Sequence, residues 1–166
     1  MLTSKVEKAL NKQIEIEANA SQFYLAMASW AETKGFEGVA NFFYRHSDEE
    51  REHMLKLIKY VNERGGHAIV PPLTKPPKLF ECLSHIFQDL LNHEIMVTRE
   101  INKVVDICLK DKDYTTHNFM QWYVAEQIEE EALARLILDK LKLIADDKGG
   151  LYLFDRDIVN MNPVKN

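Results

Sequence analysis

The chain has 166 residues, a formal net charge of -5, 46% hydrophobic residues and 28% charged residues. This length suits one domain with a single core, and the composition is that of an ordinary globular protein. The negative charge gives no general attraction for nucleic acid or for anionic membranes. No apolar run approaches the roughly 20 residues of a membrane-spanning helix, which excludes a membrane-embedded protein.

The first residues and the cysteines bear on the compartment. The opening segment, MLTSKVEKAL, lacks the apolar stretch of a secretory signal. The two cysteines, Cys82 and Cys108, lie far apart in segments with a helical pattern, where we expect reduced, packed thiols. Both observations predict a cytoplasmic protein.

Long stretches without glycine or proline, separated by short breaks, predict an all-α protein. We expect four long helices and a short C-terminal helix, over about 4–34, 38–64, 78–110, 114–148 and 151–159. Ser4 and Glu7 have the spacing of a capping box at the start of the first helix. Gly65 is expected to end the second helix, and Gly149 with Gly150 the fourth.

The segment 65–77 determines how the helices are connected. Its roughly 13 residues span about 43 Å when extended, at ~3.3 Å per residue. A helix of about 27 residues is about 40 Å long, so this segment can cross the whole bundle. The other breaks between long helices are short and force antiparallel neighbours. We therefore predict a single-domain four-helix bundle over residues 1–166, with one long crossover and parallel second and third helices.

Each long helix has a glutamate within its apolar stripe: Glu17, Glu50, Glu94 and Glu130. All four lie within about two residues of the midpoints of the predicted helices, so packing would bring them to one level. Carboxylates in one apolar layer repel each other and lose hydration, and a bound multivalent cation removes both costs. The alternative is four glutamates that face solvent, as a single helical glutamate usually does.

A Glu-x-x-His pair, Glu50 and His53, favours a metal site over that alternative. Residues three apart share one helix face, so both side chains can reach the same ion. One histidine with several carboxylates favours iron or manganese over a thiolate-type zinc site, and Glu50 can bridge two ions. The pair is a weak signal alone, and its weight comes from the matched glutamates on the other helices.

With these motifs the chain resembles the ferritins, and most closely the bacterial non-haem ferritins, over nearly its whole length. The resemblance implies a ferritin-like four-helix bundle with an intrasubunit di-iron site. It implies that the first iron is bound by Glu17, Glu50 and His53. It implies that the second iron is bound by Glu50, Glu94 and Glu130.

The resemblance also implies roles for residues around this centre. A third iron site is expected at Glu49, Glu126, Glu129 and Glu130. Gln127 matches a hydrogen-bonding neighbour of the centre, and Tyr24 and Trp122 match nearby aromatic residues. Tyr24 is expected to hydrogen-bond a ligand or lend an electron, or else to be core with a satisfied hydroxyl. His46 is expected to be an interior hydrogen-bonded histidine or an entry ligand, and His93 to face solvent or another subunit.

Two positions separate the chain from the bacterioferritins, which carry a second Glu-x-x-His on the last long helix. This chain has Gln127 and Glu130 there. Bacterioferritin haem also needs a methionine directly after the glutamate of the second helix, where this chain has Arg51, so we expect no haem. The cysteine-bound iron domain of rubrerythrins is missing, and an intrasubunit ligand set differs from the intersubunit set of the DNA-protecting mini-ferritins.

The implied function is iron storage with ferroxidase activity. Fe²⁺ would be oxidised to Fe³⁺ by O₂ or H₂O₂ at the di-iron site, and ferric mineral stored inside a shell of 24 subunits, without nucleic-acid or membrane partners. One alternative is a di-iron peroxidase or oxygenase, which would need a substrate pocket or an electron-donor domain. A second alternative is a non-enzymatic helical-bundle module, which predicts a purified protein without metal.

Overall fold

The structure is a computed structural model that describes residues 2–161. Within that range the chain forms five α-helices and no strand: α1 (Ser4–Thr33), α2 (Glu37–Glu63), α3 (Leu83–Lys110), α4 (Tyr114–Ile144) and α5 (Lys148–Ile158). The prediction of an all-α fold with a short fifth helix is therefore confirmed. Among the described residues, no helix combines the length and the apolar character that crossing a bilayer requires.

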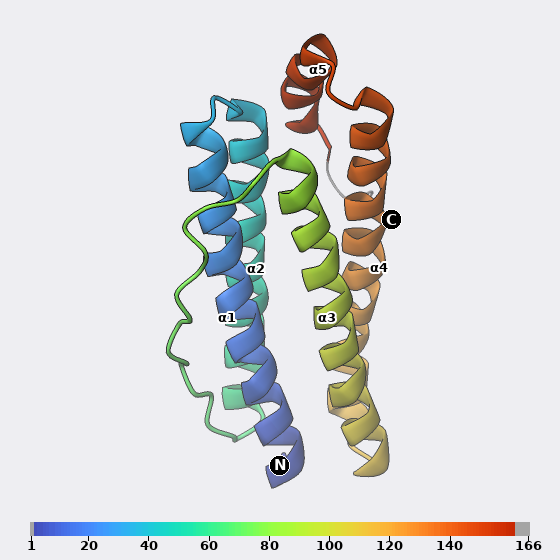
Figure 1. Ribbon diagram of the computed structural model, residues 1–166. Helices are drawn as coiled ribbons and strands as arrows, with labels where there is room; N and C mark the ends of the chain where they lie inside the picture. Colours follow the sequence, from blue (N-terminus) through green and yellow to red (C-terminus); the bar gives the residue numbers. More distant parts are fainter. Residues whose placement is uncertain (1, 162–166) are drawn as a thin grey trace.

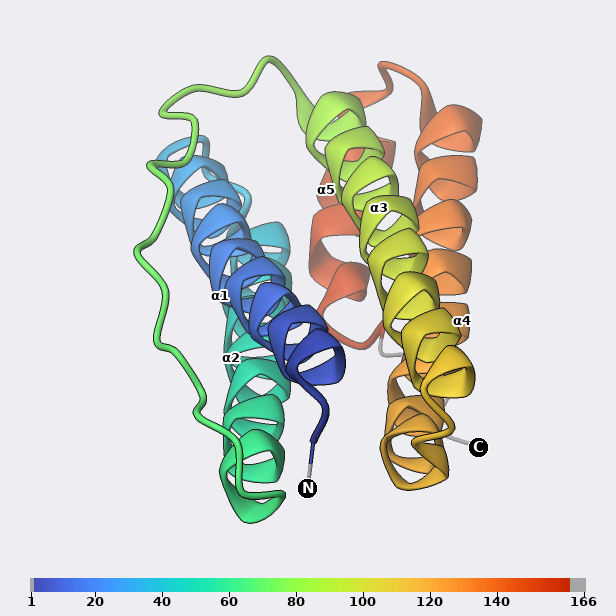
Figure 2. The ribbon, with the colours of Figure 1, turned by 90° about the horizontal axis from the view of Figure 1, so that it is seen from below.

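The four long helices form a bundle in which α1 packs along α2 and α3 along α4, each pair antiparallel (Figure 1). The segment between α2 and α3 returns along the outside of α1, so that α2 and α3 run in the same direction (Figures 1 and 2). Two asparagines of α1 hold this crossover: Asn11 Oδ1 accepts from Ile69 N at 2.7 Å, and Asn19 Oδ1 accepts from Thr74 N at 2.8 Å. The predicted crossover is confirmed.

The start of α1 differs from the predicted capping box. Thr3, not Ser4, is the N-cap residue, and its hydroxyl accepts a hydrogen bond from Val6 N at 3.3 Å. The Glu7 carboxylate does not close a capping box, because it accepts from the backbone N–H of His67 in the crossover at 3.1 Å. The N-cap of α1 therefore lies one residue earlier in the chain than the sequence pattern predicted.

The helix α3 begins at Leu83, about five residues later than predicted. The preceding residues stay non-helical because Phe80 is anchored on α1, with ring centroids 6.0 Å from Trp30 and 6.2 Å from Phe23. This shift leaves Cys82 exposed at the N-cap position, so the expectation of a packed thiol was wrong there. Cys108 is a free, buried thiol, as predicted.

The end of α4 also differs from the prediction, because it falls at Ile144 rather than near residue 148. Ala145 takes a φ of 50° and turns the chain, and Asp147 then caps α5 by accepting from Gly150 N at 2.5 Å. Gly149 and Gly150 therefore lie in the first turn of α5 and do not end α4. At the other predicted glycine stop, Gly65 has a φ of 74° just after α2, as expected.

The short helix α5 covers one end of the bundle (Figure 1). Asp155 Oδ1 accepts a hydrogen bond from Val39 N at 2.9 Å and so satisfies a free amide in the first turn of α2. A Cβ atom on Gly38 would lie 1.7 Å from the Asp155 carbonyl oxygen, so this approach requires glycine. The Phe154 ring meets Phe87 edge-on at 5.9 Å.

The buried core has two apolar parts separated by polar residues. The α5-end cluster includes Phe43 and Phe87, and the far-end cluster includes Leu57 and Ile101. Where these clusters meet, each long helix buries at least one polar or charged side chain. We call the following buried residues the acidic layer: Gln13, Glu17, Glu50, His53, Glu94, Gln127 and Glu130.

Candidate metal centre

The four predicted glutamates and the histidine all lie inside the bundle. The exposed fraction is 1% for both Glu17 and Glu94. It is 5% for Glu50, 6% for Glu130 and 9% for His53. Each long helix contributes at least one of them. The alternative of four solvent-facing glutamates is therefore excluded by their burial.

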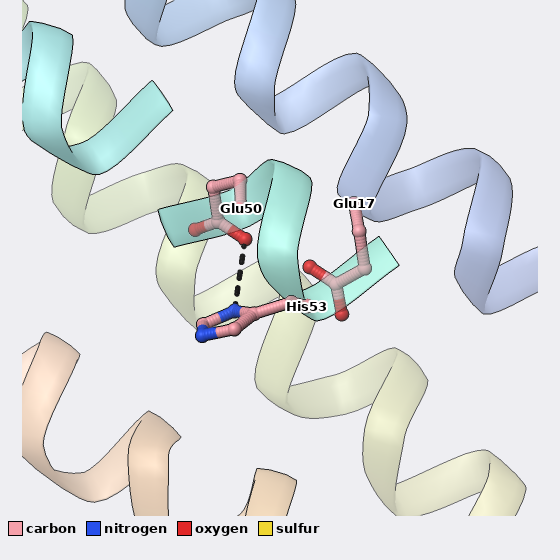
Figure 3. Close-up of side chains that lie close together, drawn as sticks. All are labelled: Glu17, Glu50 and His53. Atoms are coloured by element: carbon pink, nitrogen blue, oxygen red, sulfur yellow. Dashed lines mark ion pairs between the residues drawn. The ribbon is translucent and has the colours of Figure 1, made fainter. Parts of the chain in front are cut away.

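One half of the layer joins α1 and α2. Glu17, Glu50 and His53 point toward one another, and each offers one potential ligand atom within 4.8 Å of the others (Figure 3). His53 Nδ1 lies 3.3 Å from Glu50 Oε2. Gln13 Nε2 donates to Glu17 Oε1 at 2.8 Å, and the other oxygen, Glu17 Oε2, is buried and has no hydrogen-bond partner within residues 2–161. An unsatisfied carboxylate oxygen beside two further ligand atoms is suited to a cation.

The other half joins α3 and α4. The Glu94 carboxylate accepts from the Tyr24 hydroxyl through Oε1 and from Gln127 Nε2 through Oε2, the latter at 3.0 Å. Gln127 also donates to the Glu94 carbonyl oxygen at 3.2 Å, which fixes its position beside that carboxylate. On α4, Glu130 Oε2 lies 3.4 Å from His46 Nε2. Gln127 thus occupies the place expected of a hydrogen-bonding neighbour.

The electrostatics of the layer disfavour its ionised state when no cation is bound. Burial, reinforced by the Glu50 carboxylate, raises the pKa of Glu17 well above its usual value, and burial with the charge of Glu94 does the same for Glu50. Burial and the charge of Glu130 raise the pKa of Glu94 to about 7. A multivalent cation would offset both the lost hydration and the repulsion, so the donor set fits iron or another hard divalent ion.

Residues expected at a third site are only partly brought together. His46, Glu49 and Glu130 place ligand atoms within 4.8 Å of one another, whereas Glu126 and Glu129 do not belong to either ligand group found among the described residues. The structure thus adds His46 to the cluster. The signal for it was its spacing, three residues before Glu49 on the same face of α2.

His46 is an interior residue, as expected, and only 4% of it is exposed. Its Nδ1 lies 3.0 Å from the Phe42 carbonyl oxygen, while Nε2 has no hydrogen-bond partner among the described residues. Burial lowers the pKa of His46, but the Glu130 and Glu49 carboxylates outweigh it and leave that pKa raised.

Tyr24 connects the centre to a histidine that the sequence placed elsewhere. Its hydroxyl lies 3.0 Å from His93 Nδ1 and donates to Glu94. His93 is half-buried: its ring lies 5.7 Å from Phe23, and burial lowers its pKa to about 4. The sequence did not predict this contact with α1, which is possible because adjacent helical residues point only about 100° apart.

Two aromatic residues of α4 surround His53. Trp122 meets the His53 ring edge-on at 5.1 Å, and the Tyr123 hydroxyl donates to the His53 carbonyl oxygen at 2.8 Å. Trp122 is therefore the nearby aromatic residue that the sequence suggested. The sequence did not indicate a role for Tyr123, because a tyrosine at this helical position is equally consistent with the apolar core.

Fold and layer together define a four-helix-bundle protein with a buried carboxylate and histidine centre. The family model described as the ferritin-like domain matches residues 7–144. The chain is 44% identical to a bacterial non-heme ferritin of Campylobacter jejuni, covering 97% of this chain and 96% of that protein. It is 41% identical to a probable bacterial non-heme ferritin-like protein of Haemophilus influenzae, covering 98% of each.

Solved structures agree with these relatives. An open pore ferritin of Archaeoglobus fulgidus superposes with a TM-score of 0.94 at 37% identity, covering 97% of this chain and 98% of that one. The chain therefore belongs to the ferritin family, and its similarity is to the bacterial non-haem ferritins. Ferritins bind and store iron, which is the metal class that the donor set favours.

Proposed function

We propose that this ferritin stores iron by oxidising Fe²⁺ at the acidic layer and depositing Fe³⁺ as mineral inside a shell of 24 subunits. The observation that carries the proposal is the burial of four glutamates and a histidine, one or more from each long helix, at one level of the bundle. Iron is the substrate and cargo of this reaction rather than a resident cofactor.

The ligand assignment follows the two halves of the layer. Glu17, Glu50 and His53 bind one Fe²⁺, and Glu50, Glu94 and Glu130 bind the other, with Glu50 shared. For the third iron site we keep Glu49, Glu126, Glu129 and Glu130, of which Glu49 and Glu130 share one ligand group with His46. Filling the layer replaces protons on the glutamates of raised pKa by metal charge, so binding releases protons.

The residues act by positioning and charge stabilisation. Each Fe²⁺ gives up one electron, and two such electrons together with two protons reduce O₂ to H₂O₂, or H₂O₂ to two molecules of water. Holding both ions at one carboxylate removes the entropic cost of bringing them together. Tyr24 and Gln127 fix the Glu94 carboxylate through its two oxygens, and Gln13 holds the Glu17 carboxylate through Oε1.

The test is aerobic oxidation of Fe²⁺ by metal-free protein, followed by ferric absorbance. Glu50→Ala and Glu130→Ala should each slow the initial rate by at least about 10-fold, because both remove a ligand of the second iron. Glu63→Ala, an exposed glutamate at the end of α2, is the matched control and should keep the parent rate. Parent-like oxidation by both site variants would contradict the assignment.

The shell is tested separately by measuring the molar mass in solution. A particle of about 24 subunits is expected, and a monomer or dimer would favour a substrate-processing di-iron enzyme instead. Apolar side chains that lie exposed on the single subunit, including Met96, Ile128 and Leu136, support association.

A further inference from the structure

A cavity of about 300 Å³ lies between α2 and α4, beside the acidic layer. Its lining includes His53 and Glu130 of the layer, and also Glu49 and Glu126, which the sequence placed at a third iron site. The cavity therefore borders both groups of candidate ligands. It is large enough for a cation with part of its hydration shell.

A cationic side chain already occupies the wall of this cavity. Lys56 lines it and is the single lysine or arginine among the lining residues, all of which lie in the described range. Its Nζ atom lies over the Trp122 ring, 3.2 Å from the centroid, in the geometry of a cation–π contact. An ammonium group with an aromatic face and carboxylates around it has the surroundings of a bound cation.

Two contacts tie this lysine to the metal centre. Glu126 lines the same cavity as Lys56, and its negative charge partly opposes the lowering of the Lys56 pKa by burial. On the other side, Trp122 meets the His53 ring at 5.1 Å and 84°. Moving Lys56 would therefore change the electrostatic environment of Glu126 and the contacts of the Trp122 indole, which lies against His53.

We propose that Lys56 is a built-in counter-ion of this cavity, which a divalent metal ion must displace to occupy the carboxylates between the acidic layer and the surface. The lysine neutralises part of the cavity's charge in the metal-free protein, and its repulsion of an arriving ion keeps binding there weak. Weak binding suits a place that passes iron onward. The inference rests on the proposed function of the layer, and it assigns Lys56 a positioning and selectivity role rather than a catalytic one.

The test uses Trp122 as a local reporter. The chain has two tryptophans, so Trp30→Phe leaves Trp122 as the single emitting indole. Redox-inert Zn²⁺ is titrated into the metal-free assembled protein, and a tight phase for the layer and a weaker phase for the cavity are expected in the emission. The matched variants are Lys56→Met, which keeps the apolar stem, Lys56→Arg, which keeps the charge, and Lys59→Met, which removes an exposed charge one turn away.

Lys56→Met should lower the apparent Kd for Zn²⁺ of the weaker phase by about 5- to 10-fold, which is the effect of removing one charge near a partly solvated divalent ion. Lys56→Arg and Lys59→Met should stay within about twofold of the parent. A parent titration without a weaker phase, or equal shifts in Lys56→Met and Lys59→Met, would overturn the proposal. Glu50→Ala tests the acidic layer separately from Lys56. Loss of the tight phase in this variant supports the layer as a metal site, whatever the result for Lys56. An intact tight phase contradicts the layer as a metal site and leaves the test of Lys56 unaffected.

Discussion

The α5-end cluster and the acidic layer occupy adjacent levels of the same four helices, yet burial has opposite consequences for their side chains. In the cluster, rings such as Phe43 and Phe87 stack with centroids 5.1 Å apart and need no other partner. In the layer, Glu17 and Glu50 are equally enclosed, but burial raises their pKa values and keeps them from ionising freely. The apolar ends therefore stabilise the bundle, while the layer is held in place for its chemistry.

The largest effect on stability is expected in the cluster. Phe87→Ala should lower the free energy of unfolding of the metal-free protein by about 3–5 kcal/mol, because it leaves a cavity among fully buried rings. Chemical denaturation followed by circular dichroism, at equal subunit concentrations, measures the loss. A loss below about 1 kcal/mol would mean that the cluster is not the main source of stability.

Because the acidic layer buries ionisable carboxyl groups, the stability of the metal-free protein should depend on pH. The folded-state pKa of Glu94 is about 7, above its usual 4.5, so the folded protein binds more protons than the unfolded chain between these values. The contribution of Glu94 to stability is then fully present below about pH 4.5 and is lost as the pH rises through 7, and it amounts to at most about 3 kcal/mol.

Denaturation of the metal-free protein at pH 5 and pH 8 measures this loss. Saturating Zn²⁺ should remove most of it, because the ion stabilises the ionised carboxylates. If the metal-free protein were instead more stable at pH 8, the carboxylates of the layer would not carry the raised pKa values on which the comparison depends.

A smaller effect with the opposite sign to Phe87→Ala is expected for Glu94→Leu. At pH 8 it should leave the free energy of unfolding unchanged or raise it by about 1–2 kcal/mol, because it removes a buried charge. The hydrogen-bonding neighbours keep other partners: Tyr24 retains His93, and Gln127 retains Thr98 Oγ1 at 3.3 Å and the carbonyl of residue 94.

The same variant should bind less metal, which calorimetry with Zn²⁺ would report as a lower stoichiometry. Destabilisation by Glu94→Leu at pH 8, with metal binding unchanged, would show that this carboxylate is structural and not part of a metal site.

The smallest effect is expected at a helix end remote from both regions. Thr3→Ala removes the hydroxyl that caps α1 and should lower the free energy of unfolding by about 1 kcal/mol. Its initial rate of Fe²⁺ oxidation should equal that of the parent, because no ligand moves. A slowed oxidation would indicate that the position of α1 at the layer depends on its end.

The sequence predicted the bundle, the crossover and the depth of the glutamates because these depend on periodicity and length. Helix ends were less predictable, since tertiary contacts decide them. Phe80 packs edge-on against Trp30 just before the start of α3, and Asp147, two residues before Gly149, caps α5. An Asp three residues before Gly150 was the available signal for that cap.

Within the site, the pattern predicted the glutamates at the helix midpoints, and the resemblance predicted Gln127 and Tyr24 beside them. The contacts of Gln13 with Glu17 and of His93 with Tyr24 were not predicted. Placing His93 requires knowing how far α3 is rotated toward α1, which a single helix pattern does not fix. His46 was expected as an interior histidine or an entry ligand, and its spacing to Glu49 could also have predicted that these two residues share one ligand group. The cavity beside Lys56 depends on how α2 and α4 pack, so no pattern within either helix predicts it.

Anomalous diffraction at the iron edge, from crystals loaded with Fe²⁺ without oxygen, tests the account most directly. The account predicts iron inside the bundle, bordered by carboxylates from all four long helices and by His53. Iron found only at exposed carboxylates, with the acidic layer empty, would contradict it.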